Sequence, residues 1–291
     1  MRVTQGMLAN NSLRHLSNSY EKLGKLQDQL STGKKITRPS DDPVVAMKGM
    51  YYRTNLTEVE QYKRNLSEAY MWMDNSEDAI SHANNAMQRV RELVVQGNND
   101  ALSAEDKEAI ANEIEQIKED IVSVANTKVA GKYIFNGTAI DKAPVQSGSP
   151  PTANQQTDAF SIEVSQGVQL QVNVDPSNIF GQGLFDTLQA IEDNLNGNPS
   201  ADLDTLLAQV DDHVDQINAE RSSIGARYNR LELIEDRIGS QEVVANQILS
   251  ENEDIDLERV IIDLTIQETV HRAALGVGAD IIQPTLMDFL R

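Results

Sequence analysis

The sequence contains no cysteine, which excludes disulfides, thiolate zinc sites and a cysteine nucleophile. Aromatic residues make up only 4% of the chain and include a single tryptophan, Trp72. No apolar run approaches the roughly 18 residues that a membrane-spanning helix needs. Residues 1–6 do not begin an apolar signal core that is followed by a cleavage site. We therefore expect no membrane insertion and no export by a cleaved signal peptide.

Positive charge is scarce, because 25 Lys and Arg face 45 Asp and Glu and give a net charge of −20. A chain this acidic is unsuited to nucleic acid as its main partner, since phosphate binding needs Lys and Arg. The charge is uneven: residues 1–53 carry nine basic and four acidic residues, whereas residues 251–291 carry three basic and nine acidic ones. This complementarity favours either pairing between the two ends or two ordinary solvated helix faces.

Proline placement divides the chain. Five of the eight prolines lie between residues 144 and 199, and none occurs in residues 44–143 or 200–283. Proline costs about 3 kcal/mol inside a helix. The pattern therefore predicts a mainly α fold, in which N- and C-terminal segments form a long antiparallel helical or coiled-coil rod around a small inserted β-rich domain.

Apolar residues with helical spacing support the rod. Apolar residues that recur every seven residues, or at alternating steps of four and three, are typical of helices that pack along a seam. The first segment carries the stripe Ala9, Leu13, Leu16, Tyr20, Leu23 and Leu30. A later segment repeats every seven residues at Ile217, Ile224, Leu231, Ile238 and Ala245, with Tyr228 and Leu249 at a four-residue offset. The last helix begins its stripe with Leu257, Val260, Ile261 and Leu264.

Local signals mark where helices begin and end. Asp42 before Pro43 is typical of an N-cap followed by a first-turn proline. A helix is expected to stop at Gly97, and Ser103 with Asp106 predicts a capping box for the next one.

The insert alternates apolar and polar residues on both sides of residues 165–167, which predicts a β-hairpin over 160–174. Tyr133-Ile134-Phe135 before Asn136-Gly137 predicts another short strand and turn. The expected domains are an N-terminal axial segment (1–45), two rod segments (46–132 and 183–249), the β-rich domain (133–182) and a C-terminal axial segment (250–291).

No constellation of catalytic or metal-binding residues is evident. The histidines lie far apart and outside any zinc-binding pattern, and His271 lies near an apolar stripe, where a seam position is expected. Asp41 and Asp42 could form a paired-carboxylate site, but the cap explains Asp42 better. We expect no enzyme activity, no metal and no cofactor.

The terminal helices are expected to need partners. The first helix offers about six apolar side chains, each stabilising by about 1.5–3 kcal/mol when buried, against an ordering cost of about 1–2 kcal/mol per residue. A lone helix of this kind is marginal. We therefore expect residues 1–45 and 250–291 to be loosely ordered in the free monomer and to become ordered on assembly.

Residues at both ends carry a family resemblance. Residues 30–43 read Leu-Ser-Thr-Gly-Lys-Lys-Ile-Thr-Arg-Pro-Ser-Asp-Asp-Pro, and residues 224–232 read Ile-Gly-Ala-Arg-Tyr-Asn-Arg-Leu-Glu. With residues 251–256 and 286–291, they resemble the terminal patterns of the flagellin superfamily. Residues 43–46 read Pro-Val-Val-Ala where filament flagellins usually read Ala-Ala-Gly-Leu, so the chain most resembles the branch formed by the third hook-associated, or hook–filament junction, proteins.

The resemblance implies a subunit that self-associates in a helical lattice at the extracellular hook–filament junction of a bacterial flagellum. It implies contact with the first hook-associated protein, flagellin, the filament cap protein and a cytoplasmic export chaperone, and type III export without a cleaved signal. The seam residues expected to build the assembly are Leu13, Leu16, Tyr20, Leu23, Leu30, Ile224, Tyr228, Leu231, Ile238, Leu257, Ile261 and Leu264. Filament flagellin and a soluble coiled-coil adaptor are the alternatives.

Overall fold

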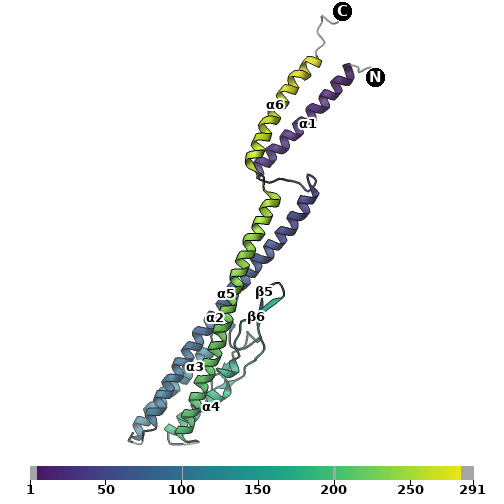
Figure 1. The fold of residues 1–291 in the computed structure, drawn as a ribbon. Helices are drawn as coiled ribbons and strands as arrows, with labels where there is room; N and C mark the ends of the chain where they lie inside the picture. The colour runs from purple at the N-terminus through teal and green to yellow at the C-terminus, as the bar shows by residue number, and fades with distance from the viewer. Residues whose placement is uncertain (1–4, 100, 199–200, 283–291) are drawn as a thin grey trace, which may run out of the picture. The chain divides into compact units, whose positions relative to one another are not determined.

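The structure, a computed structural model, describes residues 5–99, 101–198 and 201–282 (Figure 1). The described chain is mainly helical, with three small antiparallel strand pairs, and this confirms the predicted mainly α fold with a small β-rich insert. It divides into two compact units. We call Met1–Glu58 with Gln241–Arg291 the terminal unit, and Val59–Ser240 the central unit.

Helices make up most of both units. They are α1 (Gln5–Thr32), α2 (Pro43–Gly97), α3 (Ala104–Ala125), α4 (Gln182–Leu195), α5 (Leu203–Glu253) and α6 (Leu257–Ile282). The strands pair as β1 (Lys128–Val129) with β2 (Lys132–Tyr133), β3 (Val145–Gln146) with β4 (Thr152–Ala153), and β5 (Ser161–Ser165) with β6 (Val168–Gln171). A single 3₁₀ turn, η1 (Pro176–Asn178), precedes α4.

Capping chemistry determines where helices begin. The predicted capping box of α3 is confirmed: the Ser103 side chain accepts from the Asp106 amide, and the Asp106 carboxylate accepts from the Ser103 amide. At the start of α2, Asp42 Oδ1 accepts from the amides of Val44 and Val45 at 3.0 and 3.1 Å. These bonds satisfy amides that the first turn of a helix leaves without intrahelical partners.

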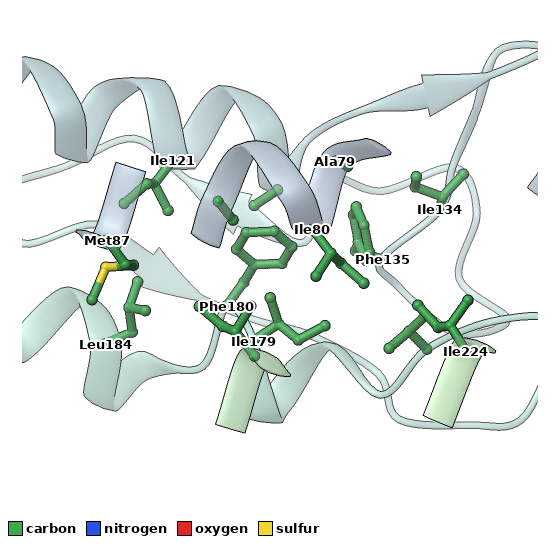
Figure 2. Close-up of a cluster of buried hydrophobic side chains, with 14 of the residues drawn as sticks. Ala79, Ile80, Met87, Ile121, Ile134, Phe135, Ile179, Phe180, Leu184 and Ile224 are labelled. Atoms are coloured by element: carbon green, nitrogen blue, oxygen red, sulfur yellow. The ribbon is translucent and has the colours of Figure 1, made fainter. Parts of the chain in front are cut away.

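The hydrophobic core belongs to the central unit. Of the 43 buried apolar residues among those described, only Ala245 lies in the terminal unit. The seven-residue repeat on α5, whose Ile224, Leu231 and Ile238 were expected in the assembly seam, faces the core of the central unit. Its residues Ile217, Ile224, Leu231 and Ile238 are at most 3% exposed. Figure 2 shows how α2, α3, α4 and α5 bring together Met87, Ile121, Leu184 and Ile224 around the Phe135 and Phe180 rings.

The insert pairs its strands close to the helices. The predicted hairpin is confirmed as β5 and β6, and Gly167 adopts the positive φ of 70° that its turn requires. The predicted strand at 133–135 is wrong in its extent, because β2 ends at Tyr133 and both Ile134 and Phe135 are buried in the core instead. The domain boundaries proposed from the sequence remain predictions.

Candidate assembly surface

In the terminal unit, α1 lies antiparallel against α6 (Figure 1). Shielded side chains recur on each helix at alternating steps of four and three residues, as expected for a two-helix seam. On α1 these positions are Ser12, Leu16, Ser19, Leu23, Leu26 and Leu30. On α6 they are Val260, Leu264, Gln267, His271, Ala274 and Gly278.

Polar and small side chains occupy much of this seam. Ser19 is only 8% exposed, and Gln267 Nε2 donates to its Oγ at 2.9 Å and to its backbone oxygen at 3.3 Å. His271 Nδ1 lies 3.3 Å from the same Oγ, which confirms the expectation that His271 is a seam residue. A seam with so few large apolar residues gains little from burial, so α1 and α6 form a weak pair on their own.

The apolar stripe predicted on α1 is divided between two faces. Leu16, Leu23 and Leu30 lie in the seam and are partly buried. Leu13 lies outside the seam and is 57% exposed. Tyr20 is 69% exposed and lies at the edge of the seam, with its ring centroid 6.1 Å from that of His271. The spacing in the sequence placed these five residues on one apolar stripe. The high exposure of Leu13 and Tyr20 was therefore not expected.

The predicted seam residues on α6 divide in the same way. Leu264 is partly buried, whereas Leu257 and Ile261 are about half exposed. Ile224, Leu231 and Ile238 are buried in the central core, where they pack within the chain itself.

Tyr228, which was also expected in the seam, lies neither between α1 and α6 nor among the buried residues of the central core. It lies at a groove of about 760 Å³ between α2 and α5 in the central unit, and it packs edge-on against Tyr70 with ring centroids 5.2 Å apart. The Tyr70 hydroxyl donates to Glu235 Oε2 at 2.7 Å, and burial, followed by Glu235, raises the pKa of Tyr70.

Exposed apolar side chains concentrate in the terminal unit. Of the 22 large apolar residues that are exposed among those described, 18 belong to this unit, and the central unit has only Met71, Val95, Tyr228 and Leu233. On α6 they surround the side of the helix that α1 leaves uncovered: Leu257, Ile261, Ile262, Ile266, Val270, Leu275 and Val277. A helix that is apolar nearly all round is normally buried on several sides, so α6 requires more cover than α1 supplies.

The parts of α2 and α5 that belong to the terminal unit also present apolar side chains to solvent. Val44, Met47, Met50 and Tyr51 are each more than half exposed at the start of α2, as are Val243 and Val244 near the end of α5. Isolated exposed apolar residues are ordinary, but a concentration on all four helical segments of one unit is typical of an interaction surface.

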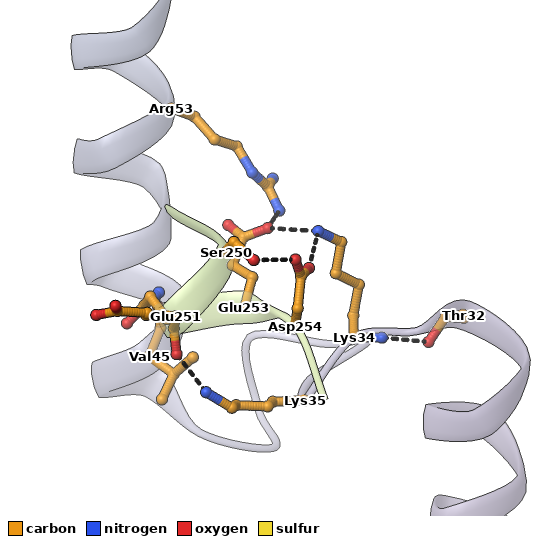
Figure 3. A network of polar contacts seen from close by, with 10 residues as sticks. Thr32, Lys34, Lys35, Val45, Arg53, Ser250, Glu251, Glu253 and Asp254 are labelled. Carbon is orange, nitrogen blue, oxygen red and sulfur yellow. Dashed lines mark hydrogen bonds and ion pairs between the residues drawn. The ribbon is translucent and has the colours of Figure 1, made fainter. Parts of the chain in front are cut away.

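Polar contacts join the connection between α1 and α2 to the connection between α5 and α6 (Figure 3). Lys34 and Asp254 form an antiparallel bridge, in which the Lys35 amide donates to Glu253 O at 2.6 Å and the Ile255 amide donates to Gly33 O at 3.1 Å. The positive φ of Gly33, 70°, lets the chain leave α1 and enter this bridge. We call these contacts, with the ion pairs below, the clasp.

Charged side chains reinforce the clasp. Glu253, whose side chain is 6% exposed, accepts from Arg53 Nη2 at 2.7 Å, and Lys34 Nζ lies 2.7 Å from Asp254 Oδ1 (Figure 3). The hydrogen bond to Asp254 raises the pKa of Lys34, and the bond from Lys34 lowers the pKa of Asp254. The charge complementarity of the chain ends is therefore used, in part, within the subunit.

Gly49 gives Glu253 its room. A Cβ at this position would lie 2.5 Å from Glu253 Oε1, so α2 accepts a glycine in its first turns to let the carboxylate approach. Glycine inside a helix costs roughly 0.5–1 kcal/mol relative to alanine, and the buried, paired carboxylate accounts for its presence.

The described residues include neither a group arranged to bind a metal ion nor a helix that could span a membrane. No group of three or more His, Cys, Asp or Glu in residues 5–99, 101–198 and 201–282 is arranged to hold a metal ion. Within the same ranges, no helix combines the length and the apolar character that crossing a membrane requires. The terminal unit is thus an apolar surface on a clasped set of helices.

Comparison with known proteins relates the chain to bacterial flagellar proteins. Residues 3–139 match the family model described as the bacterial flagellin N-terminal helical region. The chain is 25% identical to flagellar hook-associated protein 3 of Escherichia coli K12, with 96% of each chain covered. Over nearly its whole length, the chain is therefore similar to proteins of the flagellin superfamily. The flagellin of Bacillus subtilis 168 is also 25% identical, over 96% of this chain and 95% of its own.

Solved structures of flagellin-superfamily proteins share the fold. A flagellar hook-associated protein of Vibrio parahaemolyticus aligns with a TM-score of 0.68 at 21% identity, covering 74% of this chain and all of that one. The flagellar junction protein FlgL of Legionella pneumophila aligns with a TM-score of 0.59 at 18% identity, covering 71% and 99%.

The motifs that carried the family resemblance have distinct places. Lys34, Lys35, Glu253 and Asp254 lie in the clasp. Arg227 Nη1 donates to the backbone oxygen of Asn173 at 2.7 Å and so ties α5 to the β-rich insert. The motif at 286–291 lies outside the described residues. Sequence reasoning missed Ser12, Ser19 and Gln267, and their regular spacing with Leu16 and Leu264 was the signal available.

Proposed function

We propose that this chain is a structural subunit of the bacterial flagellum that forms the junction between the hook and the flagellin filament. The observation that carries the proposal is the concentration of exposed apolar side chains on the terminal unit, around a seam too polar to hold α1 and α6 firmly together. Both helices gain the cover they lack when copies of the chain pack side by side, and contacts that do not close on themselves produce a tube.

Flagellin itself is the second candidate, and the B. subtilis flagellin supports it with the same 25% identity as the E. coli hook-associated protein 3. The junction role is favoured by solved relatives that are named as hook-associated or junction proteins. This chain aligns with nearly the whole length of each of them. A structural role, and not a catalytic one, agrees with the names of these relatives.

The proposed neighbours follow from that position. We propose that the terminal unit contacts the first hook-associated protein on one side and flagellin on the other, with the filament cap protein present during assembly. We also propose type III export without a cleaved signal, and a cytoplasmic chaperone that covers the apolar faces of α6 before export. The support for the chaperone is the exposure of seven large apolar residues on that helix.

Immunogold labelling of isolated hook–filament structures tests the junction role. Gold confined to a narrow band at the outer end of the hook is the expected result. Gold along the whole filament would make the chain a flagellin, and absence of gold from hook and filament alike would exclude both candidates.

The order of the free ends remains a proposal that follows from the weak seam. We expect residues 1–45 and 250–291 to exchange their amide protons quickly in the dilute monomer and slowly after assembly. Uniformly slow exchange in both segments of the monomer would show that α1 and α6 need no neighbours.

A further inference from the structure

The α1–α6 seam contains a buried polar cluster that its apolar neighbours do not explain. Ser19 is the only one of the seam serines with a hydrogen bond to α6 among the described residues, and Gln267 and His271 both converge on it. Ser12, one heptad earlier on the same face, has no such bond to α6 in the same part of the chain. Leu13 is adjacent to Ser12 but remains outside the seam, whereas Tyr20, adjacent to Ser19, lies at its edge with its ring against that of His271.

We infer that the cluster of Ser19, Gln267 and His271, together with the clasp, sets the register in which α1 pairs with α6. A heptad seam made of similar apolar residues can slip by seven residues and still bury its stripe. A buried polar group prevents this where its partner exists in only one alignment, and polar seam residues are known to specify register in coiled coils.

The geometry of the cluster makes it selective. Ser19 Oγ accepts from Gln267 Nε2 at 2.9 Å, and its hydroxyl faces His271 Nδ1 at 3.3 Å, so it can donate when the neutral imidazole carries its proton on Nε2. A slip of one heptad in one direction would place Ser19 between Val260 and Leu264. A slip in the other direction would place it between Ala274 and Gly278. The second slip also brings Leu26 opposite Gln267 and His271, so all three polar side chains lose their bonds across the seam, which is unfavourable where they are shielded from water. The first slip brings Ser12 opposite Gln267 and His271 in place of Ser19, and there the bridge between Lys34 and Asp254 keeps the register.

The clasp and the cluster agree on one alignment. Lys34 pairs with Asp254, and moving 15 residues back along α1 and 15 residues forward along α6 reaches Ser19 and Thr269. Thr269 lies midway between Gln267 and His271, the two residues that bond to Ser19. The bridge therefore fixes the alignment at one end of the two helices, and the cluster fixes the same alignment about halfway along them.

This inference concerns the pairing of α1 with α6 in one chain and does not depend on the junction role. Its consequence is that polar bonds specify the pairing, which leaves Leu13, Tyr20 and the outer faces of α6 available for other contacts. A fully apolar seam would hold the two helices more strongly but in more than one alignment.

Cysteine crosslinking tests the register. Because the sequence contains no cysteine, only the introduced pair can form a disulfide within the chain. A Cβ at Gly278 lies 3.8 Å from Leu16 Cδ1, so the full-length variant L16C/G278C reports the observed register. L23C/G278C reports a slip of one heptad, because Leu23 would then take the place of Leu16. Oxidation of the free chain traps the alignment present whenever the two helices meet.

In the otherwise unchanged chain, we expect the L16C/G278C disulfide to form at least roughly tenfold faster than the L23C/G278C disulfide. Adding Gln267→Leu, which removes the two hydrogen bonds that Gln267 donates to Ser19 and leaves only the contact with His271, should bring the two rates closer together. Ser12→Ala, a serine change in the same seam, should leave the ratio as it was.

Ser19→Ala repeats the test with a smaller change, in case Gln267→Leu lowers the helix content measured by circular dichroism. An unaltered ratio in both variants, or equal rates before either change, would overturn the role of the cluster. A ratio that falls equally with Ser12→Ala would also overturn it, because any polar-to-apolar change in the seam would then have the same effect.

Discussion

The outer face of α6 gives the sharpest test of assembly. Ile266 and Val270 lie one helical turn apart on this face and are 55% and 50% exposed. Replacing both with aspartate removes two apolar side chains and introduces two carboxylates, without changing any residue of the central core. The expected result is a chain that folds but no longer attaches filaments to hooks.

The magnitude follows from what remains to be buried. Complete burial of such a side chain is worth about 1.5–3 kcal/mol, so about half of that per residue gives roughly 2 kcal/mol for the pair. This corresponds to roughly 30-fold weaker association at each contact. The two carboxylates must also lose water on entering the contact, which adds to the loss. The effect is repeated at every copy in a ring.

The assay counts cells with attached filaments and measures the chain retained on isolated hooks. Thermal unfolding of the purified chain provides the folding check, and the transition of the central unit should not move. Leu233→Asp is the matched control, because Leu233 is 71% exposed but belongs to the central unit. Filament attachment at the parent frequency by the double variant would refute the reasoning, as would an equal loss with Leu233→Asp.

Three further predictions concern the seam and the central unit. Leu23→Pro should leave a soluble chain with a folded central unit but abolish filament attachment, because proline breaks α1 inside the seam; normal attachment would count against the terminal-helix mechanism. Lys118→Met should destabilise the central unit by about 3–5 kcal/mol in urea unfolding, because it leaves the Glu192 carboxylate unpaired, and adding Glu192→Leu should restore most of the loss; an additive loss in the double variant would contradict this. Desolvation lowers the pKa of His213 in the folded chain, so the unfolded chain binds the extra proton and stability should fall as pH drops below about 6.5. His213→Gln should flatten that dependence between pH 7.5 and 5.5, and an unchanged slope would exclude this histidine as its source.

Local chemistry made much of the fold predictable. Helix starts at Pro43 and Ala104 followed from Asp42 and from the Ser103–Asp106 pair, because each satisfies amides within a few residues. The α5 stripe and the β5–β6 hairpin were predictable for a second reason. The spacing of their apolar residues shows which face of a helix or strand is apolar.

The seam could not be predicted as accurately, because apolar spacing does not show which side chains meet. The stripe from Leu13 to Leu30 has heptad-like steps, yet Leu13 is outside the seam, Tyr20 lies only at its edge, and Ser12 and Ser19 are inside it. Moving one position along a helix turns a side chain by about 100°, so a seam shifted by one residue exchanges apolar for polar partners. That choice depends on Gln267 and His271, more than 240 residues away in the sequence.

The mismatch between the apolar stripe and the seam is itself informative about function. A helix pair that buried its whole apolar surface within one chain would be stable alone and would have nothing to offer a neighbour. This chain instead places Ser19, Gln267 and His271 in the seam and exposes Leu13, Tyr20 and most of the large apolar residues of α6. The polar seam makes the pairing specific but weak, and the exposed apolar residues make a neighbouring subunit necessary. Under the proposed function, a chain that joined its neighbours only after export would require both properties. A stronger seam would remove the drive to assemble, and a less specific one would present the apolar faces in the wrong alignment.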